Sequence, residues 1–225
     1  MRRALILGFV VCLALTGCVG IPTSGGVETG PVIDEQLDPD FVIDPSGPRA
    51  GSAPEDILTD FMLALRGPQG NYEIAREFLT KDFATKWSPD ASATIRTGIP
   101  ATTPGEAPNT LDYTITTRAY VDPDGRYFEP GPATQVLTYS FALENGEWRI
   151  SGGPDGIVLS QSSFSVVFTE RALYFFDPTY TYLIPDVRWF ASRATLPGWA
   201  VRELLDGPAQ WLQQGVVLSA FPIST

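Results

Sequence analysis

The chain has 225 residues, of which 44% are hydrophobic, so it is long enough to bury a substantial apolar core. Its formal net charge of −11 argues against binding to nucleic acid, which needs a basic surface, and against electrostatic attachment to anionic lipid headgroups. It contains no histidine, which excludes Ser-His-Asp and Cys-His catalysis and imidazole ligands for a metal.

Residues 1–17 are predicted to be an export signal. Arg2 and Arg3 form a basic start, and an apolar run from about residue 4 to 15 follows them. The run ends in a four-residue motif made of Leu15, Thr16, Gly17 and Cys18. This motif resembles the bacterial lipobox. The resemblance implies cleavage before Cys18 and attachment of a diacylglyceryl/acyl lipid, with palmitate as an acyl chain, to Cys18, which would anchor the chain to the extracytoplasmic face of the cell membrane. The alternative is an ordinary secretory signal with a chance cysteine.

Cleavage would leave a chain with few reactive groups. Cys12 would leave with the signal and Cys18 would carry the lipid, so no thiol remains for a disulfide, a zinc site or a nucleophile. The mature chain would have 13 basic and 26 acidic residues, a charge of −13. Outside the signal, no apolar run reaches about 18 residues, so the acyl chains are expected to provide the attachment.

Residues 18–53 are predicted to form the acylated cysteine and a flexible acidic tether. Gly, Pro, Ser and Asp dominate this segment, which cannot bury enough apolar surface to offset the entropy of ordering. A weak calcium site is the alternative, but the spacing of the carboxylates fits no EF-hand. No metal or cofactor is therefore expected. The carboxylates without a nearby opposite charge are Asp34, Glu35, Asp38, Asp40 and Asp44.

The first half of the predicted domain 54–155 contains helices. Pro54 opens a helix whose apolar residues recur with a 3.6-residue period, and Gly67 marks its end. A second apolar helix is expected after a break at residues 69–71. Residues 88–110 contain four prolines and are predicted to form a loop.

The second half of this domain has the alternation of strands. Apolar residues recur at every second position in residues 111–121 and 137–143. A turn is predicted at residues 122–125, and Asn145-Gly146 is a typical hairpin turn into residues 147–150. Two helices packed on a curved antiparallel sheet make an α+β domain.

Residues 156–225 are predicted to form a connector and part of a second α+β domain. A strand at residues 173–176 could pair with residues 182–185, and Pro197 begins a helix that ends before Gly207-Pro208. Residues 216–221 are expected to form another strand. Because so few elements cannot form a stable domain, the second domain is expected to be incomplete.

The order of several motifs resembles known families. The first helices, residues 75–80, Trp87 and the hairpin at 145–150 resemble an NTF2-like, or cystatin-like, cone. Four further motifs recur in the same order in the actinobacterial LpqB lipoprotein family. They lie at residues 155–159, 173–175, 184–189 and 204–208. From about Ala172 the sequence resembles the start of a GerMN domain. In full-length family members this domain is completed and followed by a β-propeller, both expected to be missing here or to lie on a separate reading frame.

The family resemblance implies a regulatory role. LpqB-type lipoproteins are associated with the membrane histidine kinase MtrB and its response regulator MtrA, in cell-envelope and division signalling. The matching motifs are structural, so no catalytic residue is transferred. The prediction is a non-enzymatic accessory protein that binds the ectodomain of an MtrB-like sensor kinase.

Two other functions remain open because an NTF2-like cone often contains a pocket. The inward positions Tyr113, Tyr139 and Trp148 are candidates for lining it, with the tyrosines as hydrogen-bond donors to a small ligand. The alternative is that they are core aromatics. An isomerase-like enzyme would need a buried carboxylate beside Tyr113 or Tyr139. The aromatic residues between positions 174 and 190 are either a docking patch or the core of the second domain.

Overall fold

A computed structural model describes residues 45–193, 196–210, 212 and 217–219. The export signal, Cys18 and nearly all of the predicted tether lie outside these residues and stay predictions. The described chain is mixed α+β, as predicted, with one six-stranded sheet, one two-stranded sheet and several short helices.

The first helix, α2 (Pro54–Ala64), confirms the helical period of the sequence. Proline at its first position and two acidic residues in its first turn suit a helix N-terminus. Its buried face carries Ile57, Leu58 and Phe61. The helix ends just before Gly67, where the sequence predicts its end.

The next two helices are short. In α3 (Gln69–Arg76), Gly70, Asn71 and Tyr72 have left-handed φ angles, so a kink lies at the predicted break. Helix α4 (Lys81–Lys86) begins after Thr80, whose hydroxyl oxygen accepts a hydrogen bond from the Phe83 amide at 3.3 Å.

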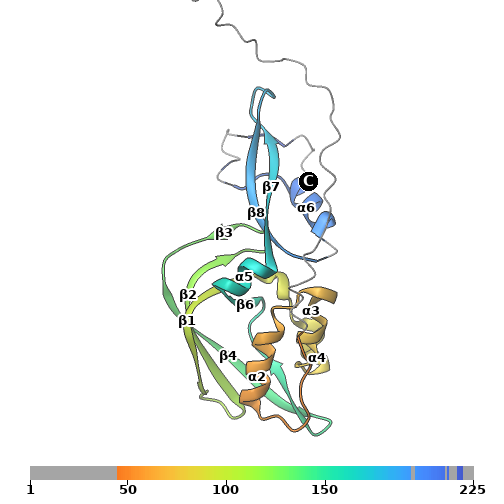
Figure 1. Ribbon diagram of the computed structural model, residues 1–225, viewed down its shortest axis with the longest axis vertical. Helices are drawn as coiled ribbons and strands as arrows, with labels where there is room; N and C mark the ends of the chain where they lie inside the picture. The colour runs from red at the N-terminus through yellow and green to blue at the C-terminus, as the bar shows by residue number, and fades with distance from the viewer. Residues whose placement is uncertain (1–44, 194–195, 211, 213–216, 220–225) are drawn as a thin grey trace, which may run out of the picture. The chain divides into compact units, whose positions relative to one another are not determined.

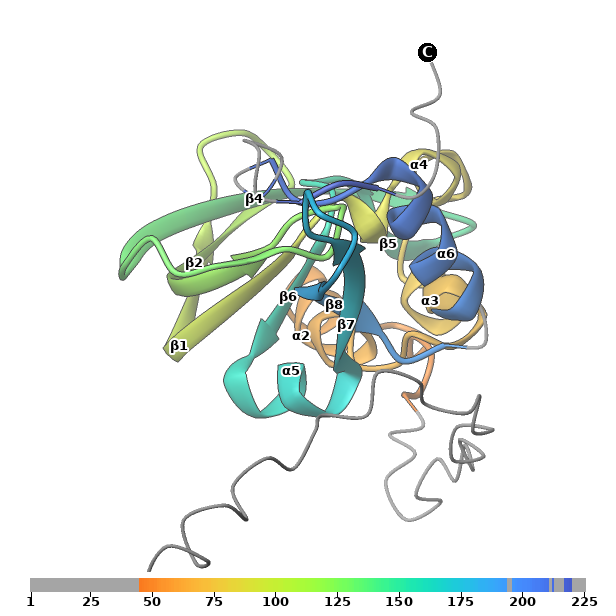
Figure 2. The ribbon, with the colours of Figure 1, turned by 90° about the horizontal axis from the view of Figure 1, so that it is seen from above.

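The large sheet has the strand order β5-β4-β2-β1-β6, with β3 paired to β2. Neighbouring strands are antiparallel, except that β1 and β6 are parallel. Figures 1 and 2 show the sheet curving beside helix α2. The strands are β1 (Ala93–Pro104), β2 (Thr110–Val121), β3 (Tyr127–Phe128), β4 (Ala133–Glu144), β5 (Glu147–Gly152) and β6 (Ile157–Ser160).

The prediction of a loop at residues 88–110 is wrong, because β1 is a long strand inside the sheet. Beyond residue 96, β1 still pairs with β2, but in the described chain no strand pairs with its other side. Proline is tolerated at such an edge, where its missing N–H removes no ladder hydrogen bond. Pro100 and Pro104 therefore mark the free side of a strand rather than its absence.

The predicted strand pattern and turns are confirmed. Alternate residues of β2 are buried, including Leu111, Tyr113 and Ile115. The β4–β5 turn has positive φ angles at Asn145 (55°) and Gly146 (84°), the conformation that an Asn-Gly hairpin turn adopts.

The residues that directly follow residue 155 form the last strand of the large sheet, β6. Strand β6 and helix α5 (Gln161–Val167) bury Ile157, Leu159 and Phe164 in the same core as α2. The division into domains at residues 155 and 156 stays a prediction.

A second, smaller core follows. Strands β7 (Phe168–Phe176) and β8 (Leu183–Ala191) are antiparallel, and Phe175 opposite Ile184 confirms the predicted pairing. Helix α6 (Leu196–Asp206) confirms the predicted helix and is followed by Gly207 at φ 95°. Most of the strand predicted at 216–221 lies outside the described residues, although Leu218 pairs with Phe176 of β7.

Candidate functional site

The three predicted pocket residues have different surroundings. The Tyr139 ring contacts Phe61 and the backbone of Gly153, where an added Cβ would lie 2.6 Å from Tyr139 Cδ1. Burial raises the pKa of Tyr139, and the nearby Tyr113 acts in the same direction. Trp148 is half-buried against the large core. Tyr139 and Trp148 are thus core residues, whereas Tyr113 lines a pocket.

This pocket, called here the Tyr113 pocket, has a volume of about 250 Å³ and lies among α2, β1, β2, β6 and α5. One part of its lining is apolar and comprises Met62, Leu63, Pro100, Val158 and Leu159. The other part is polar and comprises Thr59, Arg66, Arg96, Thr102, Tyr113, Ser160 and Ser163. None of these lining residues carries a carboxylate.

Two guanidinium groups make this pocket cationic. Arg66 and Arg96 are half-buried, and neither forms an ion pair within the described part of the chain. Burial raises the pKa of the Tyr113 hydroxyl, while the charge and hydrogen bond of Arg96 and the charge of Arg66 act to lower it. The three polar groups therefore lie close enough to act on one ligand.

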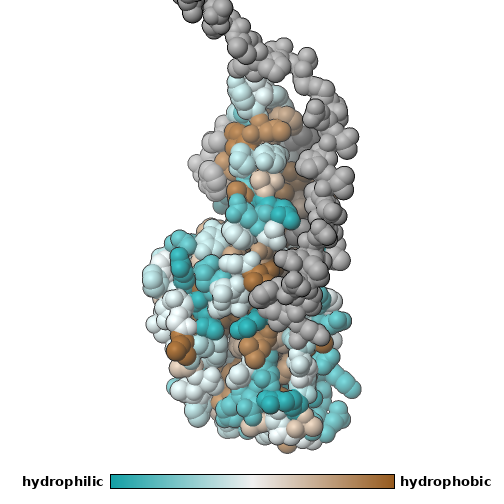
Figure 3. Space-filling model, viewed as in Figure 1, coloured by the Kyte–Doolittle hydropathy of each residue, from teal (hydrophilic) through white to brown (hydrophobic). Residues whose placement is uncertain are grey.

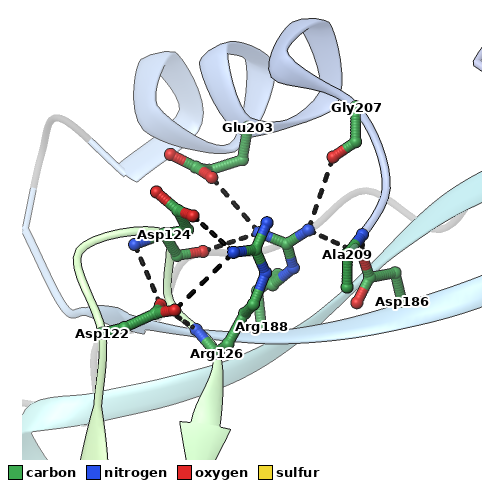
Figure 4. A network of polar contacts seen from close by, with 8 residues as sticks. All are labelled: Asp122, Asp124, Arg126, Asp186, Arg188, Glu203, Gly207 and Ala209. Carbon is green, nitrogen blue, oxygen red and sulfur yellow. Dashed lines mark hydrogen bonds and ion pairs between the residues drawn. The ribbon is translucent and has the colours of Figure 1, made fainter. Parts of the chain in front are cut away.

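A different set of charges is buried between β8, α6 and the β2–β3 turn (Figure 4). Arg188 has no exposed surface, and its Nη2 lies 2.6 Å from Asp186 Oδ2. Its Nη1 lies 3.2 Å from Glu203 Oε2 and donates to the Asp124 carbonyl oxygen at 2.8 Å. Asp186 also accepts a hydrogen bond from the Ala209 amide at 2.8 Å. We call these residues the Arg188 cluster.

The charged groups of the Arg188 cluster are paired with one another. Its carboxylates face Arg188, and Asp124 forms a further ion pair with Arg126 at 2.6 Å. Sequence reasoning missed these buried charges. The signal was there: Asp186 and Arg188 alternate with Phe190 on one side of β8, and that side is buried.

A larger pocket of about 860 Å³ lies near the start of α6. One of its lining residues, Arg193, pairs with Asp90 and lies over the rings of Tyr72, at 5.4 Å, and Trp199, at 5.1 Å. This arginine is already paired. Across the described residues, no group of three or more His, Cys, Asp or Glu side chains could hold a metal ion.

The other feature that could bind a partner is the outer side of the β7–β8 hairpin. Strand pairing places Tyr174 opposite Pro185 and Val187 opposite Ala172 on this side, and all four are exposed. Figure 3 shows apolar side chains on the surface of this hairpin. The hairpin face is defined here as Ala172, Tyr174, Leu183, Pro185 and Val187, with Tyr180 and Tyr182 at the connecting turn.

The predicted aromatic cluster is therefore divided between core and surface. Phe175 and Phe190 are buried, and Trp189 packs against the large core. Tyr174 and Tyr182 are 55% and 70% exposed. The core interpretation is confirmed for Phe175 and Phe190, and the docking interpretation of the exposed tyrosines stays a prediction.

The lining of the Tyr113 pocket and the whole large sheet lie within a region that matches a known class of lipoprotein domain. The family profile described as "Lipoprotein LpqB, N-terminal domain" matches residues 47–165. The chain therefore belongs to the LpqB lipoprotein family.

Individual relatives match over a longer region. The chain is 32% identical to Lipoprotein LpqB of Streptomyces avermitilis, with 100% of this chain and 39% of that protein covered. It is 31% identical to Lipoprotein LpqB of Bifidobacterium longum, covering 93% of this chain and 38% of that protein. It is 29% identical to Lipoprotein LpqB of Rhodococcus jostii, covering 96% of this chain and 37% of that protein. The chain thus spans less than two fifths of the length of these relatives.

These relatives are named as lipoproteins, and their names state no enzymatic activity. No solved structure matches the chain. Within the residues that the structure describes, no helix is long and apolar enough to cross a membrane.

Proposed function

We propose that this protein is a non-enzymatic accessory lipoprotein, anchored through Cys18 at the extracytoplasmic face of the membrane, that binds the ectodomain of an MtrB-like sensor histidine kinase. Membership of the LpqB lipoprotein family and the lipobox-like motif support the anchor. The implied kinase partner comes from the family resemblance.

The hairpin face is the observation that carries the proposal. A two-stranded sheet is stable only when one of its sides packs against the rest of its domain. On the packed side of β7–β8, Phe175 and Phe190 are buried. Its other side exposes Tyr174, Leu183 and Val187. Tyrosine and aliphatic residues in a contiguous exposed patch are typical of protein interfaces. The face can thus provide apolar contact area to a partner ectodomain.

The domain assignments belong to the same proposal. The curved sheet with α2 beside it supports an NTF2-like cone, and the hairpin with α6 supports the start of a GerMN domain. The match of the family profile ends at residue 165, inside α5. This position is consistent with a first domain that includes β6.

Binding to the kinase can be tested by co-purification from membranes with a matched pair of variants. Leu183→Ser removes an apolar side chain from the hairpin face, where it is 56% exposed. Val136→Ser makes a similar change on β4, where Val136 is 54% exposed. Because an interface anchor contributes more than about 1 kcal/mol, Leu183→Ser should reduce recovery of the kinase at least about fivefold, and Val136→Ser should not. Equal recovery with both variants, or no enrichment over an unrelated lipoprotein, would contradict the proposal.

A second candidate function is small-ligand binding, which the cationic Tyr113 pocket favours. An enzyme is less well supported, since the lining of this pocket provides no carboxylate for acid–base chemistry.

A further inference from the structure

We propose that the Tyr113 pocket binds a small organic carboxylate. The charged group of this ligand lies against Arg66 and Arg96, and its apolar body lies against Met62, Val158 and Leu159. This inference deepens the second candidate function by naming the ligand class, and it does not depend on kinase binding.

The charge balance around the pocket is the first argument. A half-buried cation loses part of its hydration, and this cost is offset when an anion pairs with it. Elsewhere in the described chain, Arg126, Arg188 and Arg193 each have a carboxylate partner. The half-buried Arg76 and Arg149 have none and donate to backbone carbonyl oxygens instead. What distinguishes Arg66 and Arg96 is that two guanidinium groups without a carboxylate partner in the described chain line the same pocket. A ligand carboxylate would supply the missing anion.

Hydrogen-bonding geometry favours a carboxylate. A guanidinium group presents several N–H donors in a plane and can bind both oxygens of a carboxylate. The hydroxyl of Tyr113, which lines the same pocket, adds a neutral donor, because a tyrosine is protonated at neutral pH. Arg96 Nη1 donates to the Gly98 carbonyl oxygen at 2.7 Å, and Arg96 also hydrogen-bonds Tyr113, which leaves other N–H groups of its five for a ligand.

The size and the apolar wall of the pocket limit the ligand. A volume of about 250 Å³ corresponds to roughly eight water molecules in the liquid, which fits a small organic acid. Met62, Val158 and Leu159 offer apolar contact that an inorganic anion cannot use. A carboxylate with a compact apolar body therefore matches both parts of the lining.

Calorimetric titration of the full chain in neutral detergent, at pH 7, tests this inference with three probes. Benzoate has the charge and the apolar ring, benzamide has the ring without the charge, and inorganic phosphate has the charge without the ring. Benzoate should bind saturably with a Kd of about 1 mM or tighter, and the other two at least tenfold more weakly. Equal binding of benzoate and benzamide, tighter binding of phosphate, or no saturable binding of benzoate would overturn the inference.

Variants locate the binding. Arg96→Gln should weaken benzoate binding at least tenfold, and Tyr113→Phe should weaken it severalfold. Arg171→Gln makes the same charge change at an exposed position on β7 and should leave binding unchanged. If Arg96→Gln lowers the melting temperature strongly, Arg66→Gln, just after the end of α2, replaces it in the comparison. Unchanged benzoate affinity in a folded arginine variant would overturn the assignment to this pocket.

The two proposals can fail separately. Leu183→Ser lies on the hairpin face and should retain the wild-type affinity for benzoate. Loss of kinase recovery with normal benzoate binding in Leu183→Ser agrees with both proposals. A wild-type chain that recovers the kinase but does not bind benzoate overturns the ligand inference alone.

Discussion

At the scale of single residues, Arg188 illustrates how a fully buried charge is tolerated. Its guanidinium has no exposed surface, and two carboxylates and a backbone carbonyl surround it. The desolvation of such a group is offset only while its partners stay in place. The cluster therefore fixes the relative positions of β8, α6 and the β2–β3 turn more than it adds net stability.

Glu203 is expected to make stability fall as the pH rises. Burial, and then the charge of Asp124, raises its pKa from an ordinary value of 4.5 to about 7, against the opposite effect of Arg188. Between pH 4.5 and pH 7 the folded chain holds the Glu203 proton more tightly than the unfolded chain does. Ionisation of Glu203 therefore lowers the free energy of unfolding as the pH rises. This loss is absent below about pH 4.5 and complete above about pH 7.

The variant Glu203→Gln tests this pH dependence. It removes the titration and keeps an oxygen acceptor for Arg188. Relative to the wild type, the variant should gain about 1–3 kcal/mol in the free energy of unfolding between pH 4.5 and pH 8, measured by urea denaturation at each pH. Glu170→Gln changes an exposed glutamate on β7 and is the control. A difference from the wild type that is the same at both pH values would show that Glu203 does not titrate in this range.

At the scale of elements, the β2–β3 turn is closely packed against β8. The Trp189 amide donates to the Gly125 carbonyl oxygen at 2.7 Å. A Cβ added to Gly125 would lie 2.9 Å from the Trp189 carbonyl oxygen and 3.3 Å from the Phe190 ring. This turn therefore needs glycine for two reasons, its φ of 80° and its close approach to β8.

Gly125→Ala should be more destabilising than Gly131→Ala. Both glycines have positive φ angles, so alanine adds a backbone strain of about 1–2 kcal/mol at each. Gly131 has nothing within 4 Å of an added Cβ, whereas Gly125→Ala also forces β8 away. Thermal melting should show a larger loss of stability for Gly125→Ala, by at least about 1 kcal/mol. Similar melting temperatures for the two variants would show that this contact is easily relaxed.

The elements that the sequence predicts correctly are those with local signals. The 3.6-residue period predicts α2, the alternation predicts β2, and the Asn145-Gly146 pair predicts the β4–β5 hairpin. Strand β1 has mixed signals, because its prolines and the exposed Ile99 hide the buried positions Ala93 and Ile95. Its parallel pairing with β6 joins residues more than 60 positions apart, which no local pattern can reveal.

The wrong prediction of a loop at residues 88–110 also limits what the sequence predicts about the pocket. Tyr113 was found because it lies on a clearly alternating strand. Arg96 lies in the segment that was interpreted as loop, where an arginine is expected to be solvated. Arg66 follows the end of α2, where a cation is also common. Their convergence depends on tertiary structure alone.

At the scale of the whole molecule, the kinase-binding and ligand-binding proposals use separate surfaces. The hairpin face lies on β7–β8, and the Tyr113 pocket is lined from α2, β1, β2, β6 and α5. The relatives are more than twice as long as this chain, so activities of the full-length proteins remain proposals for it. Kinase binding, as proposed, requires the chain to be at the membrane surface, and we propose that Cys18 provides that location.

Cys18→Ser is expected to abolish lipid attachment. Cys18 follows the small residue Gly17 at the end of the apolar run, which is the position that an acylated cysteine takes in a lipobox. Cells expressing the chain and grown with radiolabelled palmitate should label the wild type and not Cys18→Ser. Since an acidic chain has no electrostatic attraction to anionic lipid, the variant should also shift from the membrane fraction or be mislocalised.

Cys12→Ser is the matched control, because it changes the same residue type inside the apolar run. It should retain the palmitate label and the membrane location of the wild type. Labelling of Cys18→Ser, or full partition of unlabelled Cys18→Ser with membranes, would show that something other than this thiol holds the chain. In that case the acidic segment behind Cys18 could not act as a tether, because a tether limits the reach of the hairpin face only when its first residue is fixed in the bilayer.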